Sequence, residues 1–218
     1  MKKLCFVTFL VFVFFSVSAQ QDEKSKEILE QVSKKTNSFQ TIKADFSFSM
    51  QNEEMDINEK YDGTIILKGQ KYYIDLPTQG IKIYSDGKTI WNYMKDGNQV
   101  TISNIDEESN DLADPASLFN IYEKGFQSKF ISESKEGSES FYNIELLPEN
   151  KDESQDIIKV DVSINKSSML IHSVILFSTD GNKYSILVKK METNIPVPDS
   201  DFVFDPTKYP DIEIIDFR

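Results

Sequence analysis

The stretch IKIYSDGKTIWNYMKDGNQVTI, residues 81–102, contains the chain's only tryptophan, Trp91, between two Asp-Gly pairs. An Asp-Gly pair flanked by alternating apolar residues is typical of a tight β-hairpin turn. The middle segment places Trp91 and Tyr93 on one face, which belongs either to a core or to a ligand pocket. The stretch therefore predicts three short antiparallel strands: 81–85, 89–94 and 99–102.

The same alternation continues on both sides of this stretch, which indicates a large antiparallel sheet. In TIKADFSFSMQ, residues 41–51, apolar side chains occupy every second position from Ile42 to Met50. Turn signals such as Gly69-Gln70 separate the segments. Further strands are predicted at 56–61, 63–68, 71–76, 127–133, 140–147, 157–164, 169–177 and 183–193, with short ones at 201–204 and 212–217.

Two segments predict helices. Residues 22–37 carry an apolar stripe that includes Ile28 and Val32, with mixed charges opposite. This pattern favours a helix packed on its own domain. Residues 114–126, DPASLFNIYEKGF, begin with an aspartate cap and have Pro115 at the first helical position. Because this second helix is apolar around most of its circumference, we expect it to cover an apolar sheet face.

Residues 1–19 are typical of a secretory signal peptide, with two lysines, an apolar run and a small-residue cleavage site. Their removal takes away Lys2, Lys3 and no acidic residue, so the formal net charge falls from −12 to −14. So acidic a chain repels phosphate backbones, which argues against nucleic-acid partners. The only cysteine, Cys5, leaves with the signal. We expect an exported chain with a single domain over residues 20–218 and no thiol chemistry.

The residues give little support for catalysis. The single histidine, His172, lies in the apolar segment SMLIHSVILF, without a nucleophile motif or zinc-ligand spacing. Carboxylates cluster at 106–114 and 149–156, where the spacing of a calcium loop is missing and solvated loops are the simpler interpretation. No phosphate-binding or dinucleotide-binding fingerprint occurs. We therefore expect no enzyme, no cofactor and no metal site.

In this order, several segments resemble the periplasmic outer-membrane lipoprotein carriers, the LolA-like proteins. The segments are SFQTIKADFSFSM, GTIILKGQKYYIDLP, the stretch at 81–102, DPASLF and SDFVFDP. The most specific part is SDGKTIWNY, followed by an Asp-Gly turn and QVTI. The resemblance covers nearly the whole mature chain. It implies a mainly β fold, an unclosed antiparallel β-barrel of about eleven strands covered by a helical lid.

The resemblance further implies a periplasmic chaperone that binds the acyl chains of lipoproteins in a hydrophobic cavity. Such a carrier takes acylated lipoproteins from an inner-membrane ATP-driven extractor and passes them to an outer-membrane acceptor. We expect it to act as a monomer. By matching position, the lid residues are Leu118, Phe119 and Ile121. The cavity residues are Phe46, Phe48, Ile65, Leu67, Tyr73, Ile81, Ile83, Trp91 and Tyr93.

One position departs from the family pattern. In the family, an Arg-Pro pair follows the lysine of this strand, and the arginine holds the lid shut through hydrogen bonds to its backbone. Here the pair is Gly69-Gln70. Lys68, Lys71 or no residue at all replaces that contact. The departure leaves two alternatives open: a carrier of free phospholipid or glycolipid with the same fold, and a module that senses lipoprotein stress.

Overall fold

The computed structural model describes residues 22–105, 122, 125–149 and 156–218. The chain divides into two compact units, which are described separately. Unit 1 comprises Met1–Thr36 and Tyr122–Asp180, and unit 2 comprises Asn37–Ile121 and Gly181–Arg218. The predicted signal peptide, 1–19, lies outside the described residues, and the single domain over 20–218 stays a prediction.

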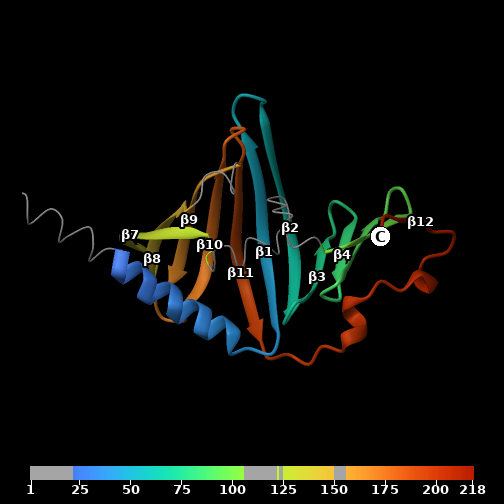
Figure 1. The fold of residues 1–218 in the computed structure, drawn as a ribbon, viewed down its shortest axis with the longest axis horizontal. Coiled ribbons are helices and arrows are strands. Elements are labelled where there is room, and N and C mark those ends of the chain that lie inside the picture. The colour runs from blue at the N-terminus through green and yellow to red at the C-terminus, as the bar shows by residue number, and fades with distance from the viewer. Residues whose placement is uncertain (1–21, 106–121, 123–124, 150–155) are drawn as a thin grey trace, which may run out of the picture. The chain divides into compact units, whose positions relative to one another are not determined.

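Unit 1 is a helix packed on an antiparallel sheet. The helix spans residues 22–37, as predicted, and runs across the strands of this unit (Figure 1). The hydroxyl of Ser25 donates to the carbonyl oxygen of Ser128 at 3.0 Å, and the ammonium of Lys24 lies 3.7 Å from the centre of the Phe130 ring. These contacts fix the helix on one face of the sheet. In pairing order, the strands are β7 (Phe126–Glu136), β8 (Glu139–Pro148), β9 (Ile157–Asn165) and β10 (Leu170–Ser178).

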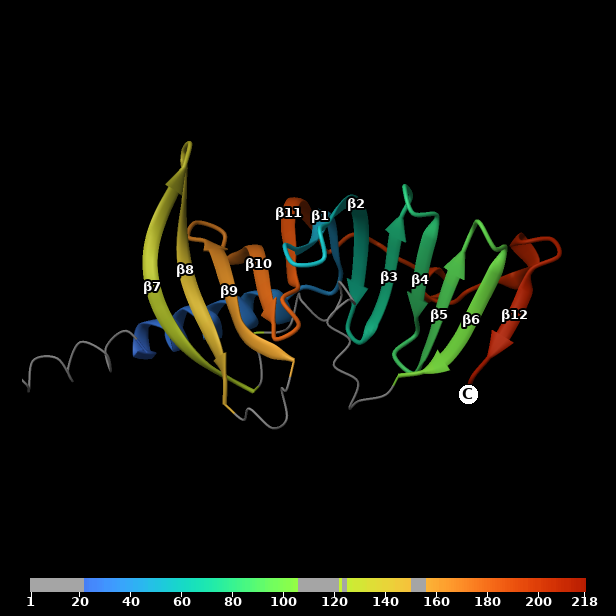
Figure 2. The ribbon, with the colours of Figure 1, turned by 90° about the horizontal axis from the view of Figure 1, so that it is seen from above.

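Unit 2 holds the stretch at 81–102 within a longer sheet (Figure 2). Its pairings are antiparallel except that β12 pairs parallel with β6. Two short 3₁₀ helices, η1 (Asp199–Phe202) and η2 (Pro206–Lys208), precede the last strand. In pairing order, the strands are β11 (Lys183–Thr193), β1 (Ile42–Asn52), β2 (Ile57–Lys68), β3 (Lys71–Leu76), β4 (Ile81–Ser85), β5 (Thr89–Met94), β6 (Gln99–Asn104) and β12 (Glu213–Asp216).

The predicted fold class is confirmed. The described residues form twelve strands against about eleven expected, and β7 and β12 each pair on one side only, so the sheet is unclosed. The helix predicted at 114–126 falls largely on residues outside the described part of the chain, and so do the lid residues Leu118, Phe119 and Ile121. Whether a lid covers the sheet therefore stays a prediction.

In two places the predicted strands are wrong by more than their end residues. The strands expected at 56–61 and 63–68 form one strand, β2, which passes through Gly63 without a turn. A Cβ on Gly63 would lie 2.7 Å from Cζ of Phe46 and 2.6 Å from Cδ2 of Leu76. The glycine therefore makes room for neighbouring side chains and does not end a strand. No strand forms at 201–204: η1 ends at Phe202, and both Phe202 and Phe204 are buried.

Candidate functional site: two apolar faces of one sheet

The strand register assigns each side chain of unit 2 to one of two faces, because directly paired residues point to the same side of a sheet. One row runs Ala44, Ile65, Ile74, Ile83 across β1 to β4. We call the surface that contains this row and Phe46 the Phe46 face. Six of the predicted cavity residues lie on it: Phe46, Phe48, Ile65, Leu67, Ile81 and Ile83.

The other three predicted cavity residues lie on the opposite face. Tyr73 pairs with Tyr84 and Tyr84 with Trp91, and this row is offset by one residue from the row of Ile74 and Ile83. Tyr93 is two residues from Trp91 and shares its side, which we call the Tyr93 face. The nine residues therefore cannot line one wall. A one-residue offset in register sends every side chain to the other side.

The Phe46 face is buried at one end and more open at the other. Phe46 and Ile65 are fully buried and Phe48 is 2% exposed, whereas Ile81 and Ile83 are half-buried. The row of Ile83 continues to Asn92, and on the same side of β5 Ile90 and Met94 flank that residue. Their partners on β6 are all polar, so the apolar surface ends at β5. The sheet thus presents a bounded apolar surface from β1 to β5 whose last rows remain partly accessible.

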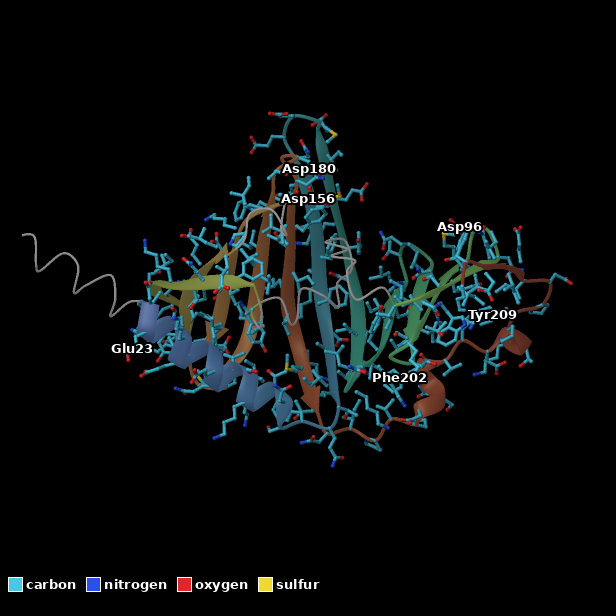
Figure 3. All side chains as sticks on the ribbon, in the orientation of Figure 1. Glu23, Asp96, Asp156, Asp180, Phe202 and Tyr209 are labelled. Atoms are coloured by element: carbon cyan, nitrogen blue, oxygen red, sulfur yellow. The ribbon has the colours of Figure 1, made fainter. Side chains whose placement is uncertain are left out.

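The Tyr93 face is covered by the chain's own C-terminal segment, which we define as residues 194–212. The rings of Phe204 and Tyr93 stack at 5.8 Å between centres, and those of Tyr209 and Tyr93 lie 4.4 Å apart. Phe202 and Tyr209 are labelled on this segment in Figure 3. Tyr93 is 7% exposed and forms a core with Val100 and Phe204, against which Trp91 packs. The aromatic face of the stretch at 81–102 is therefore core in this structure.

Burial also affects the acidity of the tyrosines on this face. Burial, followed by a hydrogen bond with the hydroxyl of Tyr209 at 3.4 Å, raises the pKa of Tyr84 well above its usual value. Burial likewise raises the pKa of Tyr73, whose hydroxyl donates to the Asp75 carboxylate at 3.2 Å. Both groups are therefore held in the neutral form.

Three charged side chains attach the start of the C-terminal segment to the β2–β3 turn. The ammonium groups of Lys68 and Lys71 each lie 2.7 Å from a different carboxylate oxygen of Asp199. Lys68 also donates to the carbonyl oxygen of Val197 at 2.8 Å. We call Lys68, Lys71 and Asp199 the clasp. Hydrogen bonds from Lys68, then Lys71, lower the pKa of Asp199 to about 2.

The clasp lies where the chain departs from the family pattern, at the Gly69-Gln70 pair. Both lysines that flank the Gly69-Gln70 turn contact the C-terminal segment, and Gly69 has a φ of 59°, which favours glycine. The sequence singled out Lys68 and Lys71 but missed Asp199, because no local pattern links the residue just before SDFVFDP to a turn so far upstream. The structure thus places a contact at this turn, to a segment other than the predicted lid.

His172 and possible metal ligands are the remaining chemical candidates from the sequence. The ring of His172 is half-buried and lies 4.4 Å from that of Phe141. Among the described residues, no group of three or more His, Cys, Asp or Glu side chains is placed to hold a metal ion. The described part of the chain also contains no helix with the length and apolarity needed to cross a bilayer.

Comparisons with known proteins agree on one family. A family model described as "Outer membrane lipoprotein carrier protein LolA" matches residues 37–205. An outer-membrane lipoprotein carrier protein of Pseudomonas putida KT2440 is 30% identical over 200 residues, which cover 90% of this chain and 91% of the relative. One from Nitrosomonas europaea is 25% identical over 178 residues, with 79% and 82% covered.

A solved structure shows the same fold. An uncharacterized conserved protein from Thermus thermophilus superposes with a TM-score of 0.57 at 12% sequence identity, covering 88% of this chain and 99% of that chain. This likeness concerns the fold alone. The family model, by contrast, matches most of the sequence and includes strands β1 to β6 and β11 of unit 2. The chain belongs to the LolA family of outer membrane lipoprotein carrier proteins.

Proposed function

We propose that this chain is a periplasmic carrier that binds the acyl chains of lipoproteins on the Phe46 face. It takes them from an ATP-driven extractor in the inner membrane and passes them to an acceptor at the outer membrane. The observation that carries the proposal is the bounded apolar surface from β1 to β5, with half-buried Ile81 and Ile83 in its more open part. Membership of the family and the names of the relatives support the same cargo.

The energetics of acyl burial limit how such a carrier works. Each buried CH₂ contributes about 0.8 kcal/mol, so three long chains fully enclosed would contribute roughly 30 kcal/mol. Non-covalent affinities reach a ceiling of about 18–21 kcal/mol. A carrier that must release its cargo therefore buries only part of the chains. An apolar surface that becomes polar at β6, where Gln99, Thr101 and Ser103 face the same side, suits partial burial.

The test compares two variants, each with an aliphatic residue replaced by glutamate, on the two faces of the same sheet. Ile83→Glu places a carboxylate on the Phe46 face, and Leu187→Glu places one on the opposite side, because Leu187 pairs with Ser47 and is 41% exposed. We expect the mature Ile83→Glu protein to lose binding of a fluorescent triacylated lipopeptide, and the Leu187→Glu protein to retain it. Circular dichroism and thermal unfolding confirm that both variants fold.

Two results would contradict the proposal. One is a folded Ile83→Glu variant that binds the lipopeptide as well as the wild type does. The other is a wild-type protein that carries no acylated protein or peptide in native mass spectrometry when isolated from the periplasm. Extraction of copurifying lipid separates the alternative cargo, because a free phospholipid or glycolipid would be recovered without an attached peptide.

A further inference from the structure

The clasp joins two like charges through one carboxylate. Lys68 and Lys71 are a directly paired couple on neighbouring strands, and like charges in that position repel. Asp199 offsets the repulsion by offering one oxygen to each ammonium group at 2.7 Å. All three side chains are about a third or more exposed, so the attachment is weak and open to salt screening.

The same hairpin reaches the Phe46 face. Leu67 and Tyr72, the paired couple next to Lys68 and Lys71, point to the opposite side of the sheet and are half-buried there. A ligand on the Phe46 face that touches Leu67 therefore lies one peptide unit from a lysine of the clasp. The clasp and the apolar surface share the backbone of one turn.

The residues between β11 and η1 make several polar contacts at this end of the sheet. The hydroxyl of Thr41 donates to the carbonyl oxygen of Ile195 at 2.7 Å. The backbone amide of Gln40 donates to Oδ1 of Asn194 at 2.8 Å. Further along, Phe202 is fully buried and Phe204 is 5% exposed. The deep anchor of the segment is thus aromatic, while its first residues, 194–199, depend on the clasp and these hydrogen bonds.

We propose that Lys68, Lys71 and Asp199 are positioning residues that couple ligand retention on the Phe46 face to the attachment of residues 194–199. The inference rests on the proposed function. With the clasp closed, the β2–β3 hairpin is fixed and the ligand is retained. With the clasp open, the hairpin moves and the ligand leaves faster. Because coupling between two sites is reciprocal, a bound ligand also protects the clasp.

The experiment uses the full mature chain loaded with a fluorescent triacylated lipopeptide. Asp199→Asn removes the charge at nearly constant shape, and Asp201→Asn is the matched control in the same 3₁₀ helix. We expect Asp199→Asn to release the lipopeptide about two- to fivefold faster than the wild type, the range for weak exposed ion pairs. High salt should speed release from the wild type relative to the Asp199→Asn variant. The Asp201→Asn protein should behave as the wild type does.

Two further measurements distinguish coupling from a merely structural role. Hydrogen exchange at the amides of Ile195, Val197 and Asp199 should slow when lipopeptide binds to the wild type, and not in Asp199→Asn. Adding Lys71→Gln to Asp199→Asn should not speed release further, because the carboxylate partner is already gone and the repulsion between Lys68 and Lys71 is removed. Asp199→Glu, which keeps the carboxylate, should restore slow release.

The outcomes separate the two proposals. A wild-type protein that binds no lipopeptide overturns the proposed function and the coupling with it. A protein that binds lipopeptide but releases it at the same rate with and without the Asp199 carboxylate overturns the coupling alone. Unchanged hydrogen exchange at residues 195–199 on binding does the same.

Discussion

Gly63 shows how one missing side chain sets the packing of unit 2. An added Cβ would lie 2.6 Å from Leu76, 2.7 Å from Phe46 and 3.0 Å from the carbonyl oxygen of Asp75. The side chains of Leu76 and Phe46 are buried, so neither moves without disturbing the core. We expect Gly63→Ala to lower the free energy of unfolding by about 1–3 kcal/mol, the usual cost of overpacking. Denaturant unfolding followed by circular dichroism measures it.

The matched control is Gly97, in the β5–β6 turn. A Cβ there would meet Gln99 at 3.6 Å, an ordinary contact, and nothing closer. Gly97→Ala should therefore change the free energy of unfolding far less than Gly63→Ala. Equal effects of the two substitutions would show that the close approach at Gly63 is relieved at no cost. The sequence prediction began a strand at Gly63 and could not anticipate this close approach, because alternation does not reveal the size of a glycine's neighbours.

Lowering the pH tests the attachment of the C-terminal segment to the β2–β3 turn. The lysines lower the pKa of Asp199 to about 2 from an ordinary 3.8, because they stabilise its charged form. A carboxyl whose pKa is lower in the folded state contributes stability above the unfolded pKa, and the contribution disappears as pH falls through the folded value. We therefore expect residues 194–199 to stay attached at pH 5 and to loosen between about pH 4 and pH 2.

A pH titration followed by NMR measures the pKa of the Asp199 carboxyl directly. The Asp199 side-chain carbon should titrate with a midpoint near 2 in the wild type. In a Lys68→Gln, Lys71→Gln double variant the midpoint should return toward the ordinary value, because both charged partners are gone. A wild-type midpoint near 4 would mean that the clasp does not persist in solution.

At the scale of elements, the sequence predicted most of the sheet. The bounds of β3, β4, β5 and β11 agree with the prediction to the residue, because the turn signals Gly69-Gln70, Asp86-Gly87, Asp96-Gly97 and Asp180-Gly181 lie beside them. The segment SDFVFDP was misjudged for a physical reason. Phe202 and Phe204 alternate as strand residues do, but they pack against a face that another part of the chain supplies. The local sequence pattern does not indicate which distant residues Phe202 and Phe204 pack against.

At the scale of the whole unit, one sheet carries two apolar surfaces, and the C-terminal segment covers the Tyr93 face. Alternation predicted that Trp91 and Tyr93 share a side, and the register confirms it. It could not tell that this side is opposite to that of Phe46 and Ile65, because the relation of faces between distant strands depends on every intervening pairing. The six aliphatic and phenylalanine positions remain the predicted lipid surface, and the aromatic stretch at 81–102 is held by Phe204 and Tyr209.

Alkaline pH tests the burial of both faces at once. Burial raises the pKa of Tyr61 on the Phe46 face, where it stacks on Phe48 at 4.9 Å, and of Tyr73 and Tyr84 on the Tyr93 face. Above pH 10 the unfolded chain therefore loses tyrosine protons that the folded chain keeps. The unfolded state then binds fewer protons, so the free energy of unfolding falls as pH rises.

Denaturant unfolding at pH 8 and pH 11 measures this decrease, and Tyr84→Phe removes the most strongly shifted of the three groups. We expect the variant to lose less stability than the wild type between these two pH values. Tyrosinate absorbance should rise together with loss of the folded circular dichroism signal. If the absorbance of all nine tyrosines rises near pH 10 while the protein stays folded, the two faces are open to solvent. In that case the C-terminal segment does not cover the Tyr93 face, and Tyr61 is not packed on Phe48.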